Sequence, residues 1–282
     1  MSPQLVWLIT GTSAGLGRDL ALAALKRGDK VIATARSVSK LGDLKSKGAD
    51  VLELDVTAPL DELHAIAKKA AAIHGRIDVV VNNAGYILVG AVEESTPEET
   101  LQQFNTNVFG ALNVSRAFLP YMRAKKSGTI VFMGSVGGWT GVANIGMYIA
   151  TKYTLRGISE SLHLEIAPLG LRSTCIDFGY FRTTFLDPAH RAPYVPRIDD
   201  YNEMSKRAND SLVAYDGKQP GDPAKGVEVV LDIVRGEGLA AGKAFPTSVA
   251  LGSDCYAVIK AQSEGVLARL EEWRAVSEST DF

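Results

Sequence analysis

The sequence has few cysteines and few histidines. Its 282 residues include two cysteines, Cys175 and Cys255, and four scattered histidines. Two isolated cysteines do not build a disulfide framework or a CxxC metal motif, and no HExxH-like spacing occurs. We therefore expect no metal site, two buried thiols that act as small apolar residues, and a reducing compartment such as the cytoplasm.

Concentrated positive charge and long apolar runs are also lacking. The net charge is −2, and no lysine or arginine cluster offers the basic face that nucleic acid binding requires. The apolar run at 5–10 is too short for a membrane span and lacks the basic lead-in of a signal peptide. Apolar residues make up 46% of the chain. We expect a globular protein with a sizeable core, no membrane span and no nucleic acid partner.

Short β-branched runs alternate with longer helical patterns along the chain. Strands are predicted at 5–10, 30–35, 50–55, 77–85, 128–135 and 171–179, with a last one within 245–254. Helices are predicted at about 15–27, 38–47, 60–74, 98–125 and 144–167. Strands that are apolar on both faces and separated by helices indicate a parallel sheet covered on both sides. The pattern predicts a doubly wound α/β fold in one domain, with ligands bound at the carboxyl ends of the strands.

A glycine-rich turn, TGTSAGLG (10–17), follows the first predicted strand. Its glycines, Gly11, Gly15 and Gly17, do not have the GxGxxG spacing, and no Gly-Lys-Ser/Thr follows. Glycines at a strand-to-helix turn nevertheless let the backbone approach a pyrophosphate at the helix N-terminus. The turn therefore predicts a dinucleotide site.

The residues after the next strands bear on the choice of cofactor. At the end of the second strand, Ala35 stands where an acidic residue would bind a ribose hydroxyl. Arg36 and Ser37 follow it, and an arginine suits a 2′-phosphate. This favours NADP over NAD, and a solvated loop arginine is the alternative interpretation of Arg36. After the third strand, Asp55 either accepts a hydrogen bond from adenine or caps its own loop. The small residues of NNAG (82–85) allow close backbone approach to the cofactor.

Two tyrosines flank Lys152 in MYIATKYTL (147–155). On a helix Tyr148 and Lys152, four residues apart, share a face, whereas Tyr153 points about 100° away from Lys152. A tyrosine and a lysine at this spacing also occur by chance. The pair alone therefore fits either catalysis or ordinary packing.

Taken together, TGTSAGLG, NNAG, Asn107 in NTNVFG, Ser135 and YIATK (148–152) resemble the short-chain dehydrogenase/reductase family, in its single-domain branch. The resemblance covers residues 5 to about 184, and the extended branch, which includes epimerases, has another glycine spacing. It implies one Rossmann domain over 1–282, with three α/β/α layers. It also implies cofactor contacts from Gly11, Ser13, Gly15, Leu16, Gly17, Arg36, Ser37, Asp55, Asn82, Gly85, Tyr148, Lys152, Gly179, Phe181 and Thr183.

The same resemblance assigns catalysis to Asn107, Ser135, Tyr148 and Lys152, and leaves Tyr153 as a packing residue. A phenol with a pKa near ~10 is a proton donor at neutral pH, and a nearby ammonium lowers that pKa. Lys152 would also bind the nicotinamide ribose. Ser135 would donate to the carbonyl oxygen, a contact worth about 3 kcal/mol. Asn107 would hold a water that passes protons to Lys152, or would simply satisfy backbone groups within its helix.

One position departs from the family pattern. The family usually has Pro-Gly after the sixth strand, and here Phe178 precedes Gly179. Gly179 and Thr183 still offer backbone and hydroxyl contacts to the nicotinamide amide. The exchange of proline for Phe178 is expected to alter the loop path or reshape the substrate side.

The segment 180–220 is rich in aromatic residues and prolines, and long segments of this kind often serve as active-site lids. They also pack on themselves, so both interpretations stand. With the loop after Ser135, the segment suggests an apolar pocket, to which we assign Trp139, Val142, Phe185 and Tyr194. A C-terminal helix at about 254–275, with an apolar stripe that includes Val266, Leu270 and Trp273, would cover the pocket mouth or a subunit contact.

These observations predict an NADPH-dependent reductase of a hydrophobic or aromatic ketone, acting reversibly on CH–OH and C=O groups. An NAD-linked alcohol dehydrogenase and a non-catalytic NADP-binding sensor or scaffold are the alternatives. The resemblance further implies a homodimer or homotetramer that pairs through the helices around 98–125 and 146–167.

Overall fold

A seven-stranded parallel sheet forms the centre of the computed structural model, which describes residues 3–187, 191–192 and 194–282. The strand order is β3-β2-β1-β4-β5-β6-β7. The strand bounds are Val6–Ile9 (β1), Lys30–Ala35 (β2), Asp50–Glu53 (β3), Val79–Asn82 (β4), Gly128–Ser135 (β5), Leu171–Phe178 (β6) and Ser248–Leu251 (β7). Each neighbouring pair is parallel, and the order reverses between β1 and β4. The predicted doubly wound Rossmann fold is confirmed.

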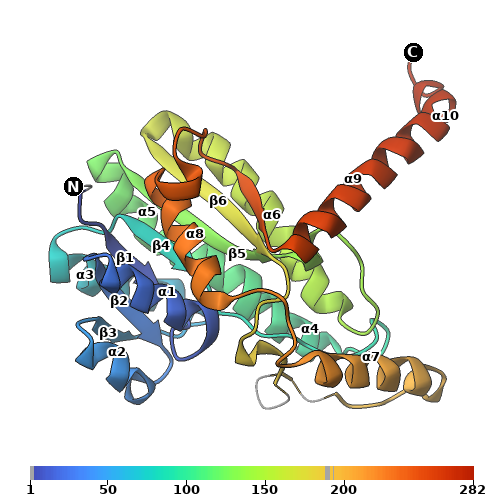
Figure 1. The fold of residues 1–282 in the computed structure, drawn as a ribbon, viewed down its shortest axis with the longest axis horizontal. Coiled ribbons are helices and arrows are strands. Elements are labelled where there is room, and N and C mark those ends of the chain that lie inside the picture. The colour runs from blue at the N-terminus through green and yellow to red at the C-terminus, as the bar shows by residue number, and fades with distance from the viewer. Residues whose placement is uncertain (1–2, 188–190, 193) are drawn as a thin grey trace.

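Helices cover both faces of the sheet (Figure 1). One face packs against α1 (Gly15–Lys26) and α8 (Pro223–Arg235), and the other against α3 (Leu60–His74), α5 (Ala111–Lys125) and α6 (Gly146–Ile166). Strand β1 shows the alternation: Trp7 and Ile9 belong to the first core, whereas Val6 and Leu8 belong to the second. All four are at most 1% exposed, as expected of a strand buried on both faces.

The helix predicted at 98–125 is divided. Helix α4 (Pro97–Phe104) begins with a capping box between Thr96 and Glu99, followed by a π-helical turn over Asn105–Gly110 before α5 starts. Such turns are rare and occur often at functional sites, and this one carries Asn107. The helix predicted at 38–47 is likewise a 3₁₀ turn (Val38–Leu41) followed by α2 (Gly42–Ser46).

Helices α7 (Asn202–Tyr215) and α8 lie where the sequence predicted no helix. Helix α7 occupies much of the expected lid segment, and α8 completes the first core. The predicted lid also includes residues 188–190 and 193, which lie outside the described part of the chain.

The C-terminal helix projects from the body of the protein. Helix α9 (Ser253–Glu272) is followed by α10 (Arg274–Glu278), and the pair points away from the sheet (Figure 1). Val266, Leu270 and Trp273 are 45%, 58% and 58% exposed. The expectation that these three side chains cover the pocket mouth is wrong, because they face solvent; the contact with the loop after β5 is made further back, where Gln262 donates to Oγ1 of Thr140 at 3.1 Å. Its other expected role, a subunit contact, stays a prediction.

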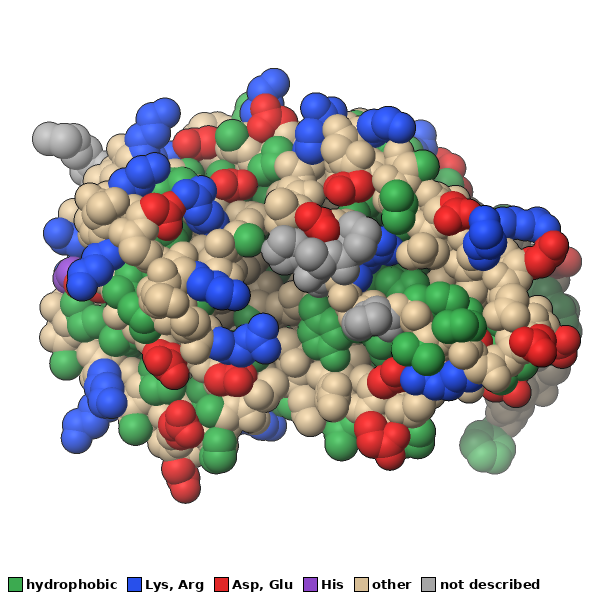
Figure 2. Space-filling view, turned by 90° about the horizontal axis from the view of Figure 1, so that it is seen from below, with side chains coloured by type: hydrophobic (Ala, Val, Ile, Leu, Met, Phe, Trp, Pro, Cys, Tyr) green, Lys and Arg blue, Asp and Glu red, His purple; other side chains and the backbone are tan. Residues whose placement is uncertain are grey.

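The two thiols are buried, as the sequence predicted. Cys175 and Cys255 are both fully buried. In the described ranges no helix combines the length and apolarity that a membrane crossing demands. Acidic and basic side chains are interspersed on the face seen from below, which carries the lid segment, and no single-sign patch dominates it (Figure 2).

Candidate active site

The glycine turn packs tightly against the segment after β4. Gly11 has φ +69°, and a Cβ there would lie 2.9 Å from the Cα of Ala84. A Cβ on Gly17 would lie 2.3 Å from Nδ2 of Asn83. Neither position therefore has room for a side chain, and the turn brings bare backbone to the N-terminus of α1, where a phosphate would sit.

Asn83, which was not predicted, braces this turn. Its Nδ2 donates to the carbonyl oxygens of Thr10 at 2.8 Å and Gly11 at 3.0 Å. The predicted contact Asn82 instead donates from Nδ2 to Oγ of Ser115 at 2.9 Å and is 4% exposed. Consecutive side chains at a strand end point to opposite faces, so only one of the pair can face the turn. The Asn82 side chain therefore faces away from the turn, and the cofactor contact of Asn82 stays a prediction.

The residues that follow β2 and β3 lie near the surface. Arg36 is exposed at the end of β2, and Oγ of Ser37 is 2.8 Å from Oγ of Ser39. Oδ1 of Asp55 accepts from the backbone N–H of Thr57 at 2.9 Å and from its hydroxyl at 2.8 Å. Asp55 therefore caps its own loop, one of the two roles expected for it. Arg36 is free to meet an anion from solvent.

Ser135, Tyr148 and Lys152 come together where β5 ends and α6 begins. Tyr148 is 8% exposed and shares a hydrogen bond with Ser135. Oγ of Ser135 accepts from the backbone N–H of Gly137 at 3.0 Å, which fixes the hydroxyl oxygen. Nζ of Lys152 lies 5.5 Å from the centroid of the Tyr148 ring and donates to the carbonyl oxygen of Met133 at 2.6 Å. Helical spacing places the phenol and the ammonium on one face, as predicted.

Burial dominates the titration of both groups. It raises the pKa of Tyr148 to about 12, against the opposing effect of the hydrogen bond with Ser135. It lowers the pKa of Lys152 to about 8, against the attraction of Cys175 and Asp177. Burial therefore outweighs the expected depression of the Tyr148 pKa by Lys152 in this structure. The reason is that the ammonium points to the carbonyl of Met133 and both groups are removed from water.

Asn107 holds the segment after NNAG. Its Oδ1 accepts from the backbone N–H of Tyr86 at 3.1 Å, and its Nδ2 donates to the Tyr86 carbonyl at 3.0 Å and to Oγ1 of Thr151 at 3.2 Å. The side chain thus satisfies backbone groups, although these belong to a neighbouring loop rather than to its own helix. Thr151 lies beside Lys152, so Asn107 ties the π turn to α6.

Two phenylalanines, one at the end of β6 and one in the loop that follows it, pack inward. Phe178 is 4% exposed, and its ring meets that of Phe181 edge-on at 5.0 Å, so both rings pack into the first core. The Phe181 ring therefore faces the core, and the cofactor contact of Phe181 stays a prediction. Phe178 likewise does not reshape the substrate side, because it points into the core.

Helix α9 fixes the path of this loop through its first turn. Oδ2 of Asp254 accepts from the backbone N–H of Tyr180 at 2.7 Å, and a Cβ on Gly179 would lie 2.1 Å from Oδ1 of Asp254. Thr183 faces the glycine turn, since a Cβ on Gly15 would be 3.8 Å from the Cβ of Thr183. The two loops therefore border the same space, as predicted for a cofactor site.

An apolar cluster surrounds Tyr148 on the substrate side. It contains Ile87, Val89, Ile145, Tyr148 and Ile149, with Tyr194 and Leu212 packed against it from the lid segment. The ring of Phe185 lies 5.9 Å from that of Tyr148. The structure thus brings the predicted substrate residues Phe185 and Tyr194 to the phenol. Seen from below, the surface is hollowed beside the lid segment and hydrophobic side chains border the hollow (Figure 2).

The other two predicted substrate residues have different surroundings. The Trp139 indole donates to Oδ2 of Asp177 at 2.9 Å, and the guanidinium carbon of Arg156 lies 3.9 Å above its ring. Trp139 is therefore held by the scaffold, and its place in the substrate pocket stays a prediction. Val142 is 42% exposed, in a loop open to solvent. Tyr153, expected to pack, is 39% exposed, because the residue after Lys152 faces away from the core.

A buried carboxylate fastens the lid segment. Glu94 is 2% exposed, and its Oε1 accepts from the backbone N–H groups of Arg197 at 2.8 Å and Ile198 at 3.1 Å. Its Oε2 accepts from the hydroxyl of Tyr194 at 3.4 Å. Burial raises the pKa of Glu94, but these hydrogen bonds outweigh it and hold the pKa below its ordinary value.

We expect Glu94→Gln to loosen the lid. The loss of charge-assisted hydrogen bonds costs about 1–3 kcal/mol, which lowers the melting temperature by a few degrees. Because the carboxylate stabilises the fold only when ionised, the difference from the unmodified protein shrinks as the pH falls below the ordinary value of 4.5. Thermal melts across pH measure this, with Glu165→Gln, the same change at an exposed position of α6, as control. Equal melting temperatures for the Glu94→Gln protein and the unmodified protein would contradict the claim that Glu94 holds the lid segment in place.

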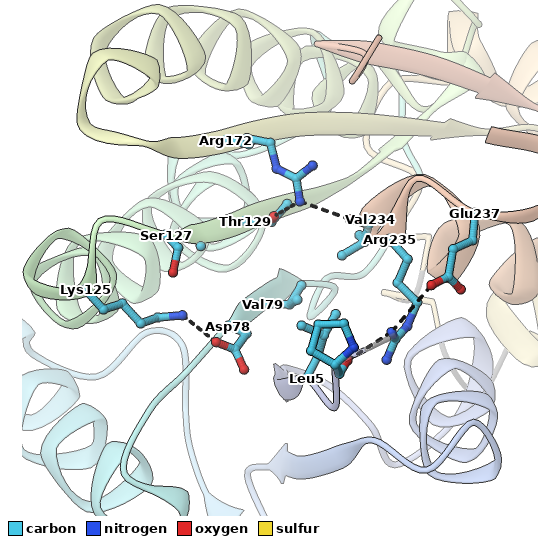
Figure 3. A pocket seen from close by; sticks show the side chains of 12 residues that line it. Leu5, Asp78, Val79, Lys125, Ser127, Thr129, Arg172, Val234, Arg235 and Glu237 are labelled. Atoms are coloured by element: carbon cyan, nitrogen blue, oxygen red, sulfur yellow. Dashed lines mark hydrogen bonds and ion pairs between the residues drawn. The ribbon is translucent and has the colours of Figure 1, made fainter. Parts of the chain in front are cut away.

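A second hollow lies at the opposite edge of the sheet (Figure 3). Leu5, Asp78, Thr129 and Arg172 line it from the amino-terminal ends of the strands, at the far end from Tyr148. The ion pair between Asp78 and Lys125 crosses its wall, and Arg172 donates to Oγ1 of Thr129 at 3.0 Å. These side chains satisfy one another, so we assign no chemistry to this hollow.

Comparison with known proteins supports a shared ancestry for the whole arrangement. The family model for short chain dehydrogenase matches residues 5–193. A 3-ketodihydrosphingosine reductase from Bacteroides thetaiotaomicron is 35% identical over 209 residues, covering 74% of this chain and 75% of that protein.

Two solved structures extend the likeness to the fold. A short-chain dehydrogenase from Streptomyces avermitilis superposes with a TM-score of 0.88 at 38% identity, covering 99% of this chain and 100% of that one. A serine dehydrogenase in its closed form, complexed with NADP⁺, superposes with a TM-score of 0.73 at 25% identity, covering 88% and 94%. With the family model matched over more than half its length, this chain belongs to the short-chain dehydrogenase family of oxidoreductases.

Proposed function

We propose that this protein is an NADPH-dependent reductase of ketones, acting on a hydrophobic or aromatic small molecule. The observation that carries the proposal is the position of the Tyr148 hydroxyl. It shares a hydrogen bond with Ser135, stands one helical turn before Lys152, and is surrounded by an apolar cluster. A proton donor in an apolar pocket beside a nucleotide site suits carbonyl reduction.

The residues around the glycine turn fit a nicotinamide dinucleotide. Gly11 and Gly17 leave the backbone bare, and Arg36 is exposed where a ribose 2′-phosphate would lie. Further contacts are proposed for Ser13, Leu16, Gly85, Gly179 and Thr183. When bound, the cofactor supplies the hydride. The NADP⁺ complex of the serine dehydrogenase, 25% identical, supports this choice of cofactor.

The protein's own residues handle the proton. Tyr148 gives its hydroxyl proton to the oxygen that becomes the alcohol, and Ser135 donates a hydrogen bond to the same oxygen. Lys152, with a pKa of about 8, carries a positive charge at neutral pH and stabilises the phenolate that remains. Asn107, in its π turn, positions the loop at Tyr86 and is proposed to hold the water that returns a proton to Lys152.

Apolar side chains of the lid segment support a hydrophobic substrate. Phe185, Tyr194 and Leu212 approach Tyr148 with apolar surface. The reductase from Bacteroides thetaiotaomicron carries a ketone substrate in its name, which supports a ketone here as well. Val142, on the open loop after Ser135, is proposed as a rim residue of the same pocket.

We expect Arg36→Asp to reverse the cofactor preference. A charge-assisted arginine–phosphate contact is worth about 1.5–3 kcal/mol, so KM for NADPH should rise about 10- to 100-fold while NADH improves. Initial rates with both cofactors measure this. Lys69→Asp makes the same charge change on the surface of α3 and serves as control.

The outcome also separates the alternatives. An unmodified protein that prefers NADH would replace the proposal with an NAD-linked alcohol dehydrogenase. Cofactor binding without oxidation of NADPH, over a panel of aromatic and aliphatic ketones, would indicate a non-catalytic sensor or scaffold.

We also propose a homodimer or homotetramer in a reducing compartment, the cytoplasm. Both cysteines are buried free thiols, which suits reducing conditions. An apolar groove of about 600 Å³ follows α4 and the π turn, lined by Ser95, Pro97, Thr100, Leu101, Phe104 and Phe109. Leu101 and Phe109 are 56% and 45% exposed there. The groove lies on the helices through which the family resemblance implies pairing.

A further inference from the structure

Asp177 is a fully buried acid directly beneath the proposed catalytic residues. It belongs to β6, where Ile176 and Phe178 face the core of α1 and α8. Strand alternation therefore turns Cys175 and Asp177 to the other face, which α6 covers. Asp177 pairs in register with Gly134, one residue before Ser135. No role was assigned to it from the sequence.

The contacts of the Asp177 carboxylate all come from donors. Oδ1 accepts from the backbone N–H of Ser135 at 3.2 Å and from the thiol of Cys175 at 3.5 Å, and Oδ2 accepts from the Trp139 indole at 2.9 Å. Burial raises the pKa of Asp177, while the hydrogen bonds from Trp139, Cys175 and Ser135 oppose it. A set made of donors matches an ionised carboxylate, which can only accept.

The neighbouring sequence makes room for this acid. A Cβ on Gly134 would lie 2.1 Å from Oδ1 of Asp177, so position 134 has to remain a glycine while the carboxylate is there. Arg156 closes the far side by lying over the Trp139 ring and donating to the carbonyl oxygen of Gly138 at 3.1 Å. The acid thus sits in a space formed by β5, β6, α6 and the turn after Ser135.

Asp177 also acts on Lys152 through its charge. The groups that face Lys152 are Cys175 and Asp177 from β6, Tyr148 from its own helix, and the neutral carbonyl of Met133 from β5. Cys175 is held as a neutral thiol, because burial places its pKa far above the ordinary value. Among the groups that face Lys152, Asp177 therefore carries the negative charge. Arg156 and the thiol of Cys255, which donates to the Asp177 carbonyl at 3.2 Å, complete the groups around Asp177.

We propose that Asp177 is a positioning residue of the reduction. Its carboxylate fixes Ser135 through the backbone, and its charge keeps Lys152 in the ammonium form that the proton transfer requires. The inference rests on the proposed function. The effect of the Asp177 charge on the protonation of Lys152 can nevertheless be measured without turnover. A purely structural acid would stabilise the fold and leave the titration of Lys152 where it is.

The test is the pH at which Lys152 loses its proton, measured on the full-length protein by competitive labelling with acetic anhydride. The amine reacts only when unprotonated, so the acetylation rate of the peptide that contains Lys152 reports its titration midpoint. In Asp177→Asn, which keeps the size of the side chain, we expect the midpoint to fall by about one pH unit. Cys255→Ala, which touches the Asp177 carbonyl rather than the carboxylate, should leave the midpoint unchanged.

The pH dependence of kcat is the second measurement of the same effect. For the most active ketone of the panel, the pH above which kcat falls should move down by the same amount in Asp177→Asn. An unmoved midpoint in this variant would overturn the inference, even if activity or stability falls. A moved midpoint in a protein that reduces no ketone would uphold the electrostatic link and refute the proposed function instead. If Asp177→Asn does not fold, Asp177→Ser, which is smaller and admits a water, is held to the same criterion.

Discussion

Replacing Tyr148 with phenylalanine is expected to lower kcat for ketone reduction by about 10³-fold, within the usual range for losing a general acid. The exchange removes one oxygen and keeps the ring, so the contacts with Phe185 and the apolar cluster persist. KM for NADPH and the melting temperature should therefore change little. The measurement is NADPH oxidation with an active ketone at saturating cofactor.

Tyr153→Phe is the matched control for this experiment. It makes the same chemical change five residues further along α6, on a ring that is 39% exposed. We expect unchanged turnover in the control. Equal loss in both variants would mean that the hydroxyls stabilise the helix, and full activity of Tyr148→Phe would remove the proton donor from the mechanism.

Lys152→Met is expected to abolish most activity and yet to stabilise the protein. Burial lowers the pKa of Lys152 from 10.5 to about 8, so the fold pays for holding an ammonium at neutral pH. Methionine removes that cost but also loses the hydrogen bond to the carbonyl of Met133. We expect a net gain of about 1 kcal/mol, or ~2–4 °C in Tm, with kcat reduced about 10²- to 10⁴-fold.

The sign of the pH dependence follows from the same depressed pKa. Between about 8 and 10.5 the unfolded chain binds the proton that the folded chain has lost, so stability rises with pH across this window. Lys152→Met should flatten that rise, which thermal melts across pH can show. In the unmodified protein, ketone reduction should decline above about pH 8 as the ammonium is lost. A destabilised Lys152→Met protein would contradict the burial argument.

The sequence predicted the sheet and the catalytic helix because each depends on local patterns. Buried strands such as β1 are continuous apolar runs, and the spacing of Tyr148 and Lys152 is a property of the helix alone. The π turn around Asn107 was not predictable, because it differs from an ordinary helix by one residue in hydrogen-bond register.

The sequence predicted the site less well where tertiary contacts determine the direction of a side chain. Asn82 and Asn83 are alike in sequence, and only the direction of β4 determines which one reaches the glycine turn. Trp139 was assigned to the pocket because it follows Ser135. Its indole donates a hydrogen bond to Asp177 on β6, which is far from it in the sequence. The burial of Asp177 and Glu94 could not be predicted from the sequence, because it depends on segments that lie far from them along the chain.

The central claim is that Tyr148 protonates the oxygen of a carbonyl held beside the nucleotide site, where a bound nicotinamide cofactor would supply the hydride. NADPH carrying deuterium at the transferring position of C4, incubated with the protein and an active ketone, tests this directly by mass spectrometry of the product. The account predicts one deuterium on the carbinol carbon of the alcohol. Cofactor consumption without deuterium in the product, or no consumption with any ketone of the panel, would contradict it.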